Sequence, residues 1–422
     1  MFDYIIIGAG TAGSVLAGRL SEDPAKNVAL LDAGTGKAPW RYTTVPQPGL
    51  NGRSVLLAPG PELASTSIAP ADFDFWAAQG NPGWAYADVL PYLHKVETNP
   101  TPHLARPNLQ VFTGSHASRI LTQGRRAVGV EFMHGGLLKQ LRTAGEVLLC
   151  AGAIQSPQLL MLSGIGDHAQ LLANGIATAH HLPGVGLHLH DPVDVVLGAA
   201  HALWAWLPRS WVRRLQGVHD RTGLWDRTLA QAGGLLHSQP GQPVPDLQLA
   251  FMPIRRGHAL YIRLLQPTSR GSVRLHGKDP LQPPYIHPNL LGTMADVERL
   301  RSGFQQAQRM VAQPALAHWA RGAGRAAARQ TRSGVELEFH LRETAVAAGH
   351  PVGSCRMGPG APGGDGQHLD VVDARLRVHG IAGLRVVDAS VMPRIVSGNT
   401  TATTTMLAEK AADMLRADAA QG

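Results

Sequence analysis

The fold of this chain is decided near its start by the stretch Asp3-Tyr4-Ile5-Ile6-Ile7-Gly8-Ala9-Gly10-Thr11-Ala12-Gly13. Its apolar, β-branched first half predicts a buried strand, and residues 14–20 have the amphipathic pattern of a helix. The glycines between them form a Gly-x-Gly-x-x-Gly motif, which allows a tight turn from strand to helix. Main-chain N–H groups in such a turn can approach a pyrophosphate at the positively polarised start of the helix.

The next segment supports the same interpretation. Residues 28–31 predict a second strand, and Asp32 follows it about 20 positions after the glycines. A carboxylate at the end of this strand can accept hydrogen bonds from the hydroxyls of a ribose. These features predict a dinucleotide-binding strand–helix–strand unit, and the motif alone fits both NAD and FAD. The expected cofactor-binding residues in this unit are Gly8, Gly10, Thr11, Ala12, Gly13, Asp32, Ala33 and Gly34.

Length and composition exclude several classes of protein. The chain has 422 residues, of which 44% are hydrophobic, so it is long enough for two or three globular domains and is not disordered. It has no apolar run of the ~20 residues that cross a bilayer. Cys150 and Cys355 cannot form a disulfide framework, and no Cys-x-x-Cys pair indicates zinc. The chain begins without a basic leader or a cleavage site, so we expect a cytoplasmic location.

The net charge of +8 does not by itself indicate a nucleic-acid partner. The positive charge comes mostly from arginines scattered along the chain, and the densest group, RSWVRR at residues 209–214, is short. We expect a solvated helix surface there rather than a phosphate-binding one. Trp204, Trp206 and Trp211 lie close by and would suit either a packed helix, which we favour, or a patch at a membrane interface.

Elsewhere the hydrophobic pattern separates two styles of structure. Residues 35–106 predict loops with short helices, the clearest of them at 87–96. Further strands are expected at 109–112, 127–132, 146–150, 246–251, 271–275 and 384–387. Helices are expected at 155–162, 204–207, 211–215, 296–311, 334–344 and 400–415. The strands between about 196 and 365 alternate as antiparallel strands do, whereas the last segment returns to the style of the first.

Several longer motifs resemble one known family. Residues 152–166 (GAIQSPQLLMLSGIG) and 350–358 (HPVGSCRMG) are similar to signatures of the glucose–methanol–choline (GMC) flavoprotein oxidoreductases. Residues 383–390 (GLRVVDAS) and 397–400 (SGNT) follow the same family's pattern. The resemblance covers most of the chain, and its branch is that of choline dehydrogenase and aliphatic alcohol dehydrogenase.

The resemblance implies an FAD-dependent enzyme that oxidises a small alcohol, primary or choline-like, to a carbonyl compound. His350 would take the hydroxyl proton, and a hydride would pass to flavin N5. A histidine suits this because its ordinary pKa of ~6.5 leaves a neutral base near working pH. Asn399 would bond the substrate oxygen, although beside Gly398 it also suits a turn. Further cofactor-binding residues implied in this way are Gly152, Asp388, Ala389, Asn399 and Thr400.

The implied architecture is α/β with an α+β second domain. A Rossmann-like FAD-binding domain would comprise residues 1–195 and 366–422. A substrate-binding domain, built on an antiparallel sheet flanked by helices, would comprise residues 196–365. Cys355, inside the histidine motif, is expected to be a buried small apolar group rather than a nucleophile.

The chain departs from the family's pattern in three places. Residues 54–67 stand where the family has a second flavin loop with a glycine pair, and Glu62 adds a negative charge there. Residues 98–105 replace a long segment that covers the substrate side. His188-Leu189-His190-Asp191-Pro192 replaces a segment that ends in Asp-His. A missing cover admits water, which weakens electrostatic interactions in the site.

Two hypotheses therefore stay open, and a third has much less support from the sequence. The chain is either a working alcohol dehydrogenase or oxidase with a shortened site, or a catalytically impaired relative that binds FAD weakly or acts as a scaffold. An NAD-dependent reductase has only the glycine turn in its favour. The sequence leaves the substrate's identity open, and also whether the electron acceptor is oxygen, a quinone or a carrier protein.

Overall fold

A computed structural model describes residues 1–34, 40–59, 69–98, 105–197, 232–242, 244–254, 257–316, 334–360, 369–398 and 400–421. Within these residues the buried hydrophobic side chains form two clusters. The larger cluster lies among the N-terminal strands, the C-terminal helix and the segments between them. The smaller cluster lies beneath a separate antiparallel sheet.

The main sheet combines parallel and antiparallel pairing. Its strands are β1 (Phe2–Ile7), β2 (Val28–Leu31), β5 (Leu109–Phe112), β6 (Ser115–Gln123), β7 (Arg126–His134), β8 (Leu137–Leu149) and β19 (Leu384–Val386). They follow the order β5-β2-β1-β8-β7-β6, and β19 also pairs with β8. The first part of β8 pairs antiparallel with β7, whereas its last part runs parallel to β1 and β19. The parallel part is the predicted dinucleotide-binding sheet.

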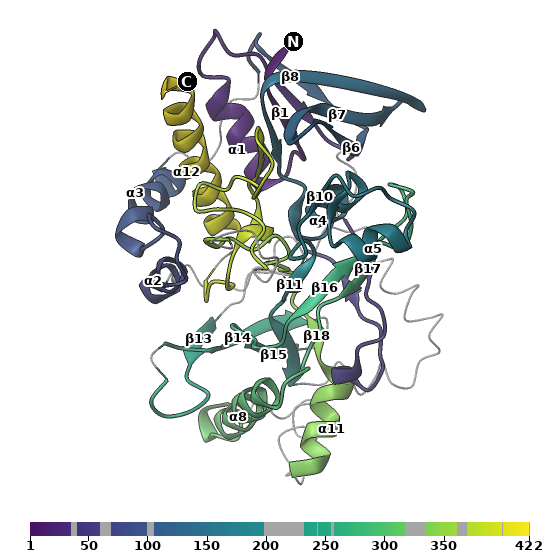
Figure 1. Cartoon of the computed structure of the whole chain (residues 1–422). Helices are drawn as coiled ribbons and strands as arrows, with labels where there is room; N and C mark the ends of the chain where they lie inside the picture. The colour runs from purple at the N-terminus through teal and green to yellow at the C-terminus, as the bar shows by residue number, and fades with distance from the viewer. Residues whose placement is uncertain are drawn as a thin grey trace.

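Two helices pack side by side near this sheet. They are α1 (Thr11–Leu20) and α12 (Thr400–Gln421), drawn purple and yellow in Figure 1. Near the end of α1, Arg19 forms an ion pair with Glu409 at 2.9 Å, and each residue lies a little over two turns into its helix. Further along, Arg416 of α12 forms an ion pair at 2.7 Å with Glu22, just after α1, so the two helices run in the same direction. Because α1 starts where β1 ends, both helix N-termini lie toward the carboxyl end of the parallel strands.

Shorter elements complete this part of the molecule. The helices are α2 (Pro70–Ala78), α3 (Tyr86–Thr98), α4 (Gly152–Leu162) and α5 (His168–Ala173), with one 3-10 turn at Pro48–Leu50. The short strands are β3 (Tyr42–Thr43), β4 (Leu56–Leu57), β9 (Ile165–Gly166) and β10 (His180–His181). Of the helices, α3 packs on α12, and α4 packs on β6 and on the 3-10 turn Ala389–Val391.

A second sheet has the antiparallel pairing that the alternating pattern predicts. Its order is β13-β14-β15-β12-β18. The strands are β12 (Val193–Leu197), β13 (Ala232–Leu236), β14 (Leu247–Ile254), β15 (Gly257–Leu264) and β18 (Val346–Ala347). The helices α8 (Met294–Val311) and α11 (Gly334–Thr344) lie against it (Figure 1). A three-stranded sheet, β11 (Leu187–Leu189), β16 (Gly271–Arg274) and β17 (Tyr285–His287), lies between the two larger ones.

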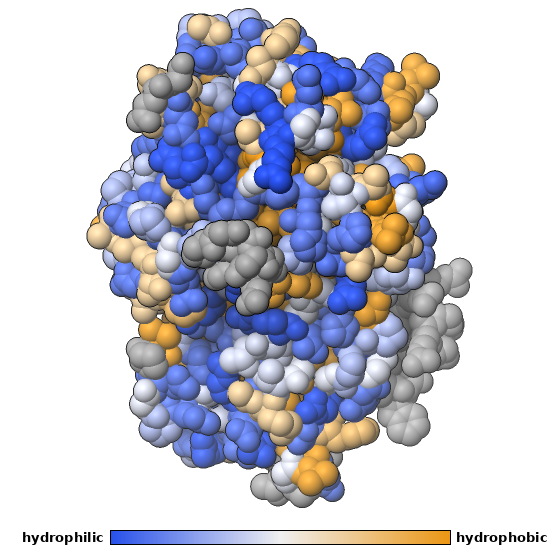
Figure 2. Space-filling model, viewed as in Figure 1, coloured by the Kyte–Doolittle hydropathy of each residue, from blue (hydrophilic) through white to orange (hydrophobic). Residues whose placement is uncertain are grey.

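The predicted elements that fall on described residues are present, with shifted ends. The structure also has β6 and the first part of β8, which the sequence pattern did not indicate. The helices expected at 204–207 and 211–215 lie outside the described residues, and the boundaries of the two domains stay a prediction. Within the described residues, neither α8, α12 nor any shorter helix is long and apolar enough to cross a membrane. Figure 2 shows hydrophilic residues over most of one face, with hydrophobic residues in scattered groups.

Candidate active site

The parallel strands end together at one edge of the main sheet, which we call the carboxyl edge. Gly8 follows β1 and donates its N–H to the carbonyl oxygen of Leu31 at 2.7 Å. Cys150 follows β8 and donates to Ile7 at 2.8 Å. Val387, after β19, donates to Leu149 at 2.8 Å. Ligands of open α/β sheets bind outside such an edge, where the strand order changes direction, so the site is expected here.

The glycine turn is tight on two sides and open on the third. Gly8 has φ of +103°, a conformation that side chains disfavour. A Cβ atom on Gly13 would lie 1.8 Å from the carbonyl oxygen of Gly8. A Cβ atom on Gly10 would meet no atom within 4 Å. The glycines thus allow helix and strand to touch and leave free space directly in front of the turn.

The start of α1 is suited to an anion. No side chain caps its first turn, and that turn contains no acidic residue. Gly10 and Thr11 are exposed, whereas Ala12 and Gly13 are buried. The unpaired N–H groups of a helix start carry partial positive charge, so the phosphates of a nucleotide would be stabilised here.

Asp32 lies across the turn from α1, in the position predicted for ribose binding. Its side chain is half-buried, and Oδ1 accepts a hydrogen bond from the N–H of Ala9 at 3.4 Å. Ala33 and Gly34, which follow it, are exposed. One carboxylate oxygen therefore steadies the glycine turn, and the carboxylate still has acceptor positions for a ligand's hydroxyl groups.

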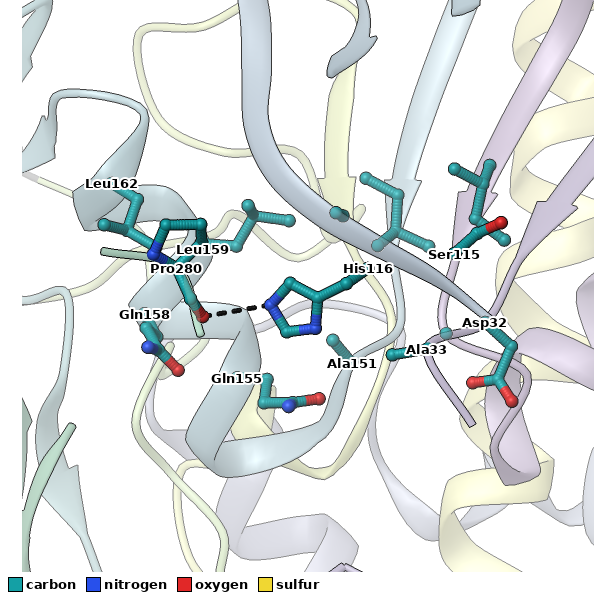
Figure 3. Close-up of a pocket in the computed structure, with 14 residues that line it drawn as sticks. Asp32, Ala33, Ser115, His116, Ala151, Gln155, Gln158, Leu159, Leu162 and Pro280 are labelled. Atoms are coloured by element: carbon teal, nitrogen blue, oxygen red, sulfur yellow. Dashed lines mark hydrogen bonds between the residues drawn. The ribbon is translucent and has the colours of Figure 1, made fainter. Parts of the chain in front are cut away.

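A hollow adjoins Asp32 (Figure 3). It is lined by the ends of β1 and β2, by β6, by one face of α4 and by Pro280. His116 on β6 donates from Nε2 to the carbonyl oxygen of Pro280 at 3.0 Å, and Gln158 on α4 donates to that of Gln282 at 2.9 Å. The loop between β16 and β17 is thereby fastened over one wall. The sequence analysis did not identify His116 or Pro280, since neither lies in a motif.

Asp388 is committed to bonds within the chain. Its carboxylate is 3% exposed and accepts hydrogen bonds from the N–H of Gly152 at 2.9 Å, from the Ser156 hydroxyl at 2.5 Å and from the N–H of Ser390 at 2.8 Å. Burial raises the pKa of Asp388, and these donors oppose that shift. The carboxylate joins the segment after β8 to the segment after β19. Any effect of Asp388 on a cofactor would therefore pass through the main chain of Gly152 and Ala389.

His350 reaches the same edge from the second sheet. Its side chain is half-buried, and its Nδ1 atom lies 3.4 Å from the hydroxyl oxygen of Thr400, the first residue of α12. The segment that follows His350 runs beside the 3-10 turn after β19. There Gly353 donates to Ala389 at 3.3 Å, and Cys355 donates to Ser390 at 2.9 Å. The structure thus brings His350 to Thr400 and the segment after His350 to Ala389, whereas Asn399 lies outside the described residues.

Two histidines near His350 in the fold, His188 and His190, are shielded from solvent. His190 is fully buried, donating from Nδ1 to His188 at 2.7 Å and accepting at Nε2 from Ile395 at 3.1 Å. Burial lowers the pKa of His190 to about 3 and that of His188 to about 4, so both rings are neutral at working pH. Cys355 is also fully buried, and burial raises its pKa, which confirms the expected small apolar group.

Comparisons with known proteins agree with this geometry. The family described as GMC oxidoreductase matches through its N-terminal model at residues 100–193 and its C-terminal model at residues 267–408. Alcohol dehydrogenase [acceptor] of Pseudomonas putida is 31% identical, over 98% of this chain and 96% of that protein. An oxygen-dependent choline dehydrogenase of Escherichia coli is 33% identical, over 98% and 95%.

Solved structures show the same fold. A pyridoxine 4-oxidase from Mesorbium loti superposes with a TM-score of 0.78 at 23% identity, covering 98% of this chain and 99% of that chain. An FAD-dependent oxidoreductase from Chaetomium thermophilum superposes with a TM-score of 0.80 at 20% identity, covering 99% and 100%.

The chain is internally shorter than its relatives. The alignment with the P. putida protein extends over 536 positions, whereas the whole chain has 422 residues. More than a hundred positions of the alignment therefore have no counterpart here.

Proposed function

Since this chain belongs to the GMC oxidoreductase family, we propose that it oxidises the CH–OH group of a small alcohol, primary or choline-like, with His350 as the base. It is an FAD-dependent oxidoreductase. One observation carries the finer proposal: His350 and the start of α12 lie at the carboxyl edge that also holds the glycine turn.

The nucleotide half of FAD fits the residues at that edge. Its pyrophosphate would lie in front of Gly10, where space is open, at the uncapped start of α1. Asp32 would accept hydrogen bonds from the ribose, and the adjoining hollow would hold the adenine. Gly152, whose own Cβ position is also open, would allow a second close approach of cofactor to main chain.

At the reactive half, His350 would take the proton of the substrate hydroxyl. When bound, FAD would supply a two-electron acceptor for the hydride that leaves the carbon bearing the hydroxyl. The start of α12 beside the imidazole would stabilise negative charge that develops on the substrate oxygen. Asn399, implied by the resemblance, would add a hydrogen bond to that oxygen.

Anaerobic reduction of the purified protein tests the proposal. We expect visible flavin absorption that is bleached by one or more members of a panel of primary alcohols and choline, with the corresponding aldehyde formed in equal amount. Flavin that is bleached by dithionite and by no alcohol in the panel would contradict it. Reoxidation by air or by an added quinone then distinguishes an oxidase from a dehydrogenase.

The missing internal segments favour one alternative, in which the chain holds FAD without turnover. More than a hundred aligned positions are absent. Residues 54–67 stand where the family's second flavin loop would lie, and residues 98–105 stand where its cover would lie. This alternative predicts bound flavin that no alcohol reduces, so the same titration separates the two functions.

A further inference from the structure

The segment that carries His350 pairs with the strand β12 in an irregular way. The antiparallel ladder begins where Asp194 pairs with Val346, and it resumes where His190 pairs with Val352. On one strand three residues lie between His190 and Asp194. On the other strand five residues lie between Val346 and Val352. The segment with His350 therefore carries two extra residues.

The extra residues lie opposite a single residue. Ala348 still donates its N–H to the carbonyl oxygen of Pro192 at 2.9 Å, so the regular register continues to that point. Between Ala348 and Val352 stand residues 349–351, and only Asp191 faces them. Such a bulge bends its strand and redirects a side chain, and bulges are frequent beside active sites.

A bulge leaves main-chain N–H groups without the carbonyl oxygens that they would bond in a regular strand pair. Here a side chain accepts a hydrogen bond in their place. The N–H of His350 donates to Oδ1 of Asp191 at 3.1 Å, and the main chain of Gly349 acts on the same carboxyl by opposing the rise of its pKa. Gly349 supplies the φ of +80° that the bend requires, and Pro351 has no N–H to satisfy. The Asp191 side chain thus substitutes for a strand's carbonyl oxygen.

We propose that Asp191 is the positioning residue for His350: its carboxyl anchors the bulge and so holds the imidazole beside Thr400 at the carboxyl edge. Without the two extra residues, His350 would stand opposite His190, which is fully buried. The inference concerns the residue that sets the base in place, and it rests on the function proposed above.

The burial of Asp191 supports a specific role, because an isolated buried carboxyl is costly. The side chain is 1% exposed, and within the described part of the chain Oδ2 has no hydrogen-bond partner. Burial raises the pKa of Asp191 to about 7, with Asp194 adding to the shift and Arg263 opposing it. A side chain that only filled space here would be more stable as an apolar residue.

The test compares Asp191→Ala with Asp191→Asn in the holoenzyme. The alanine variant should keep its flavin, exchange the amide hydrogens of residues 349–350 faster, and be reduced by alcohol about 10- to 100-fold more slowly, because the base is misplaced. The asparagine side chain keeps an oxygen that can accept a hydrogen bond from the main-chain N–H of His350. This variant should therefore restore slow exchange and a reduction rate within about threefold of wild type.

Asp246→Asn provides the matched control. Asp246 is also buried, and its carboxyl accepts hydrogen bonds from Ser238 in the second sheet, away from His350. This variant should change neither the exchange at residues 349–350 nor the rate of reduction.

Three results would overturn the proposal. The first is Asp191→Ala with wild-type exchange and a wild-type reduction rate. The second is a folded Asp191→Asn variant whose flavin is reduced more than tenfold more slowly than that of wild type. This result can be obtained even if the alanine variant does not fold. The third is an equal loss in Asp246→Asn. If His350→Ala is reduced at the wild-type rate, the proposed function fails instead, while the exchange measurement still decides whether Asp191 anchors the bulge.

Discussion

The two halves of the site are built in different ways. The nucleotide half, comprising the glycine turn, Asp32 and the hollow, is formed mainly by neighbouring turns after β1, β2 and β8. The reactive half is assembled from segments far apart in the chain: His350 bonds Asp191 across 159 positions, and its Nδ1 atom lies 3.4 Å from the hydroxyl of Thr400, 50 positions away. The nucleotide half uses main-chain shape and open space, whereas the reactive half uses buried carboxyls to hold irregular backbone.

This difference predicts which kind of change affects which half. Substitutions that fill space should expel the cofactor from the nucleotide half while the protein stays folded. Substitutions that remove a buried carboxyl should disturb the reactive half while the cofactor stays bound. The stability of the reactive half should also depend on pH, since its anchor is a titratable group.

The largest effect is expected from the pH dependence of Asp191. Its pKa of about 7 in the folded protein lies above the ordinary value of 3.8, so the folded state binds its proton more tightly than the unfolded chain. This contribution to stability is complete below about pH 4 and is lost as the pH rises to about 7, by roughly 4 kcal/mol at most.

Urea unfolding of wild type and Asp191→Asn at pH 5 and pH 8 measures this contribution to the free energy of unfolding. The asparagine variant lacks the titration, so its free energy of unfolding relative to wild type should rise from pH 5 to pH 8. Arg263 and Asp194 face Asp191 in both proteins. A difference between the two proteins that is the same at both pH values would contradict the buried, proton-binding carboxyl.

A smaller effect is expected at the nucleotide half, from Gly10→Ala. The added Cβ meets no atom within 4 Å, and φ of Gly10 is −69°, so the apoprotein should unfold as wild type does. The methyl group would occupy the space assigned to the pyrophosphate. We expect FAD to bind about a hundredfold more weakly, or about 2.7 kcal/mol, by titration of the apoprotein.

Gly234→Ala is the control for this variant. Gly234 lies in β13 of the second sheet, and its Cβ would likewise meet no atom within 4 Å. It should bind FAD as wild type does. Equal FAD affinity in Gly10→Ala and wild type would show that the cofactor does not approach the glycine turn.

Much of the fold could be predicted because local pattern and tertiary environment agree. The strand β1, the turn and β2 are fully buried or tightly constrained, so their apolar residues and glycines mark them directly. The strand β6 was missed because its buried positions do not alternate. The first part of β8 was missed because residues 137–140 are exposed at a sheet edge, where no apolar pattern is required.

The candidate site was predictable to a similar extent. The glycine turn, Asp32 and His350 lie in contiguous motifs, and a reader of the sequence can find them. Asp191 lies in a segment that the sequence analysis marked only as a departure from the family's pattern. Its contact with His350 depends on a strand pairing whose register includes two extra residues, and no local pattern reveals such a register.

The central claim is that the imidazole of His350 serves as the base for a flavin held at the carboxyl edge. The most direct measurement is the anaerobic rate at which an alcohol substrate bleaches the flavin in His350→Ala, compared with wild type and with His94→Ala, whose ring is 66% exposed on α3. The account predicts that His350→Ala retains its flavin and loses bleaching, while His94→Ala behaves as wild type. Bleaching of His350→Ala at the wild-type rate would contradict it.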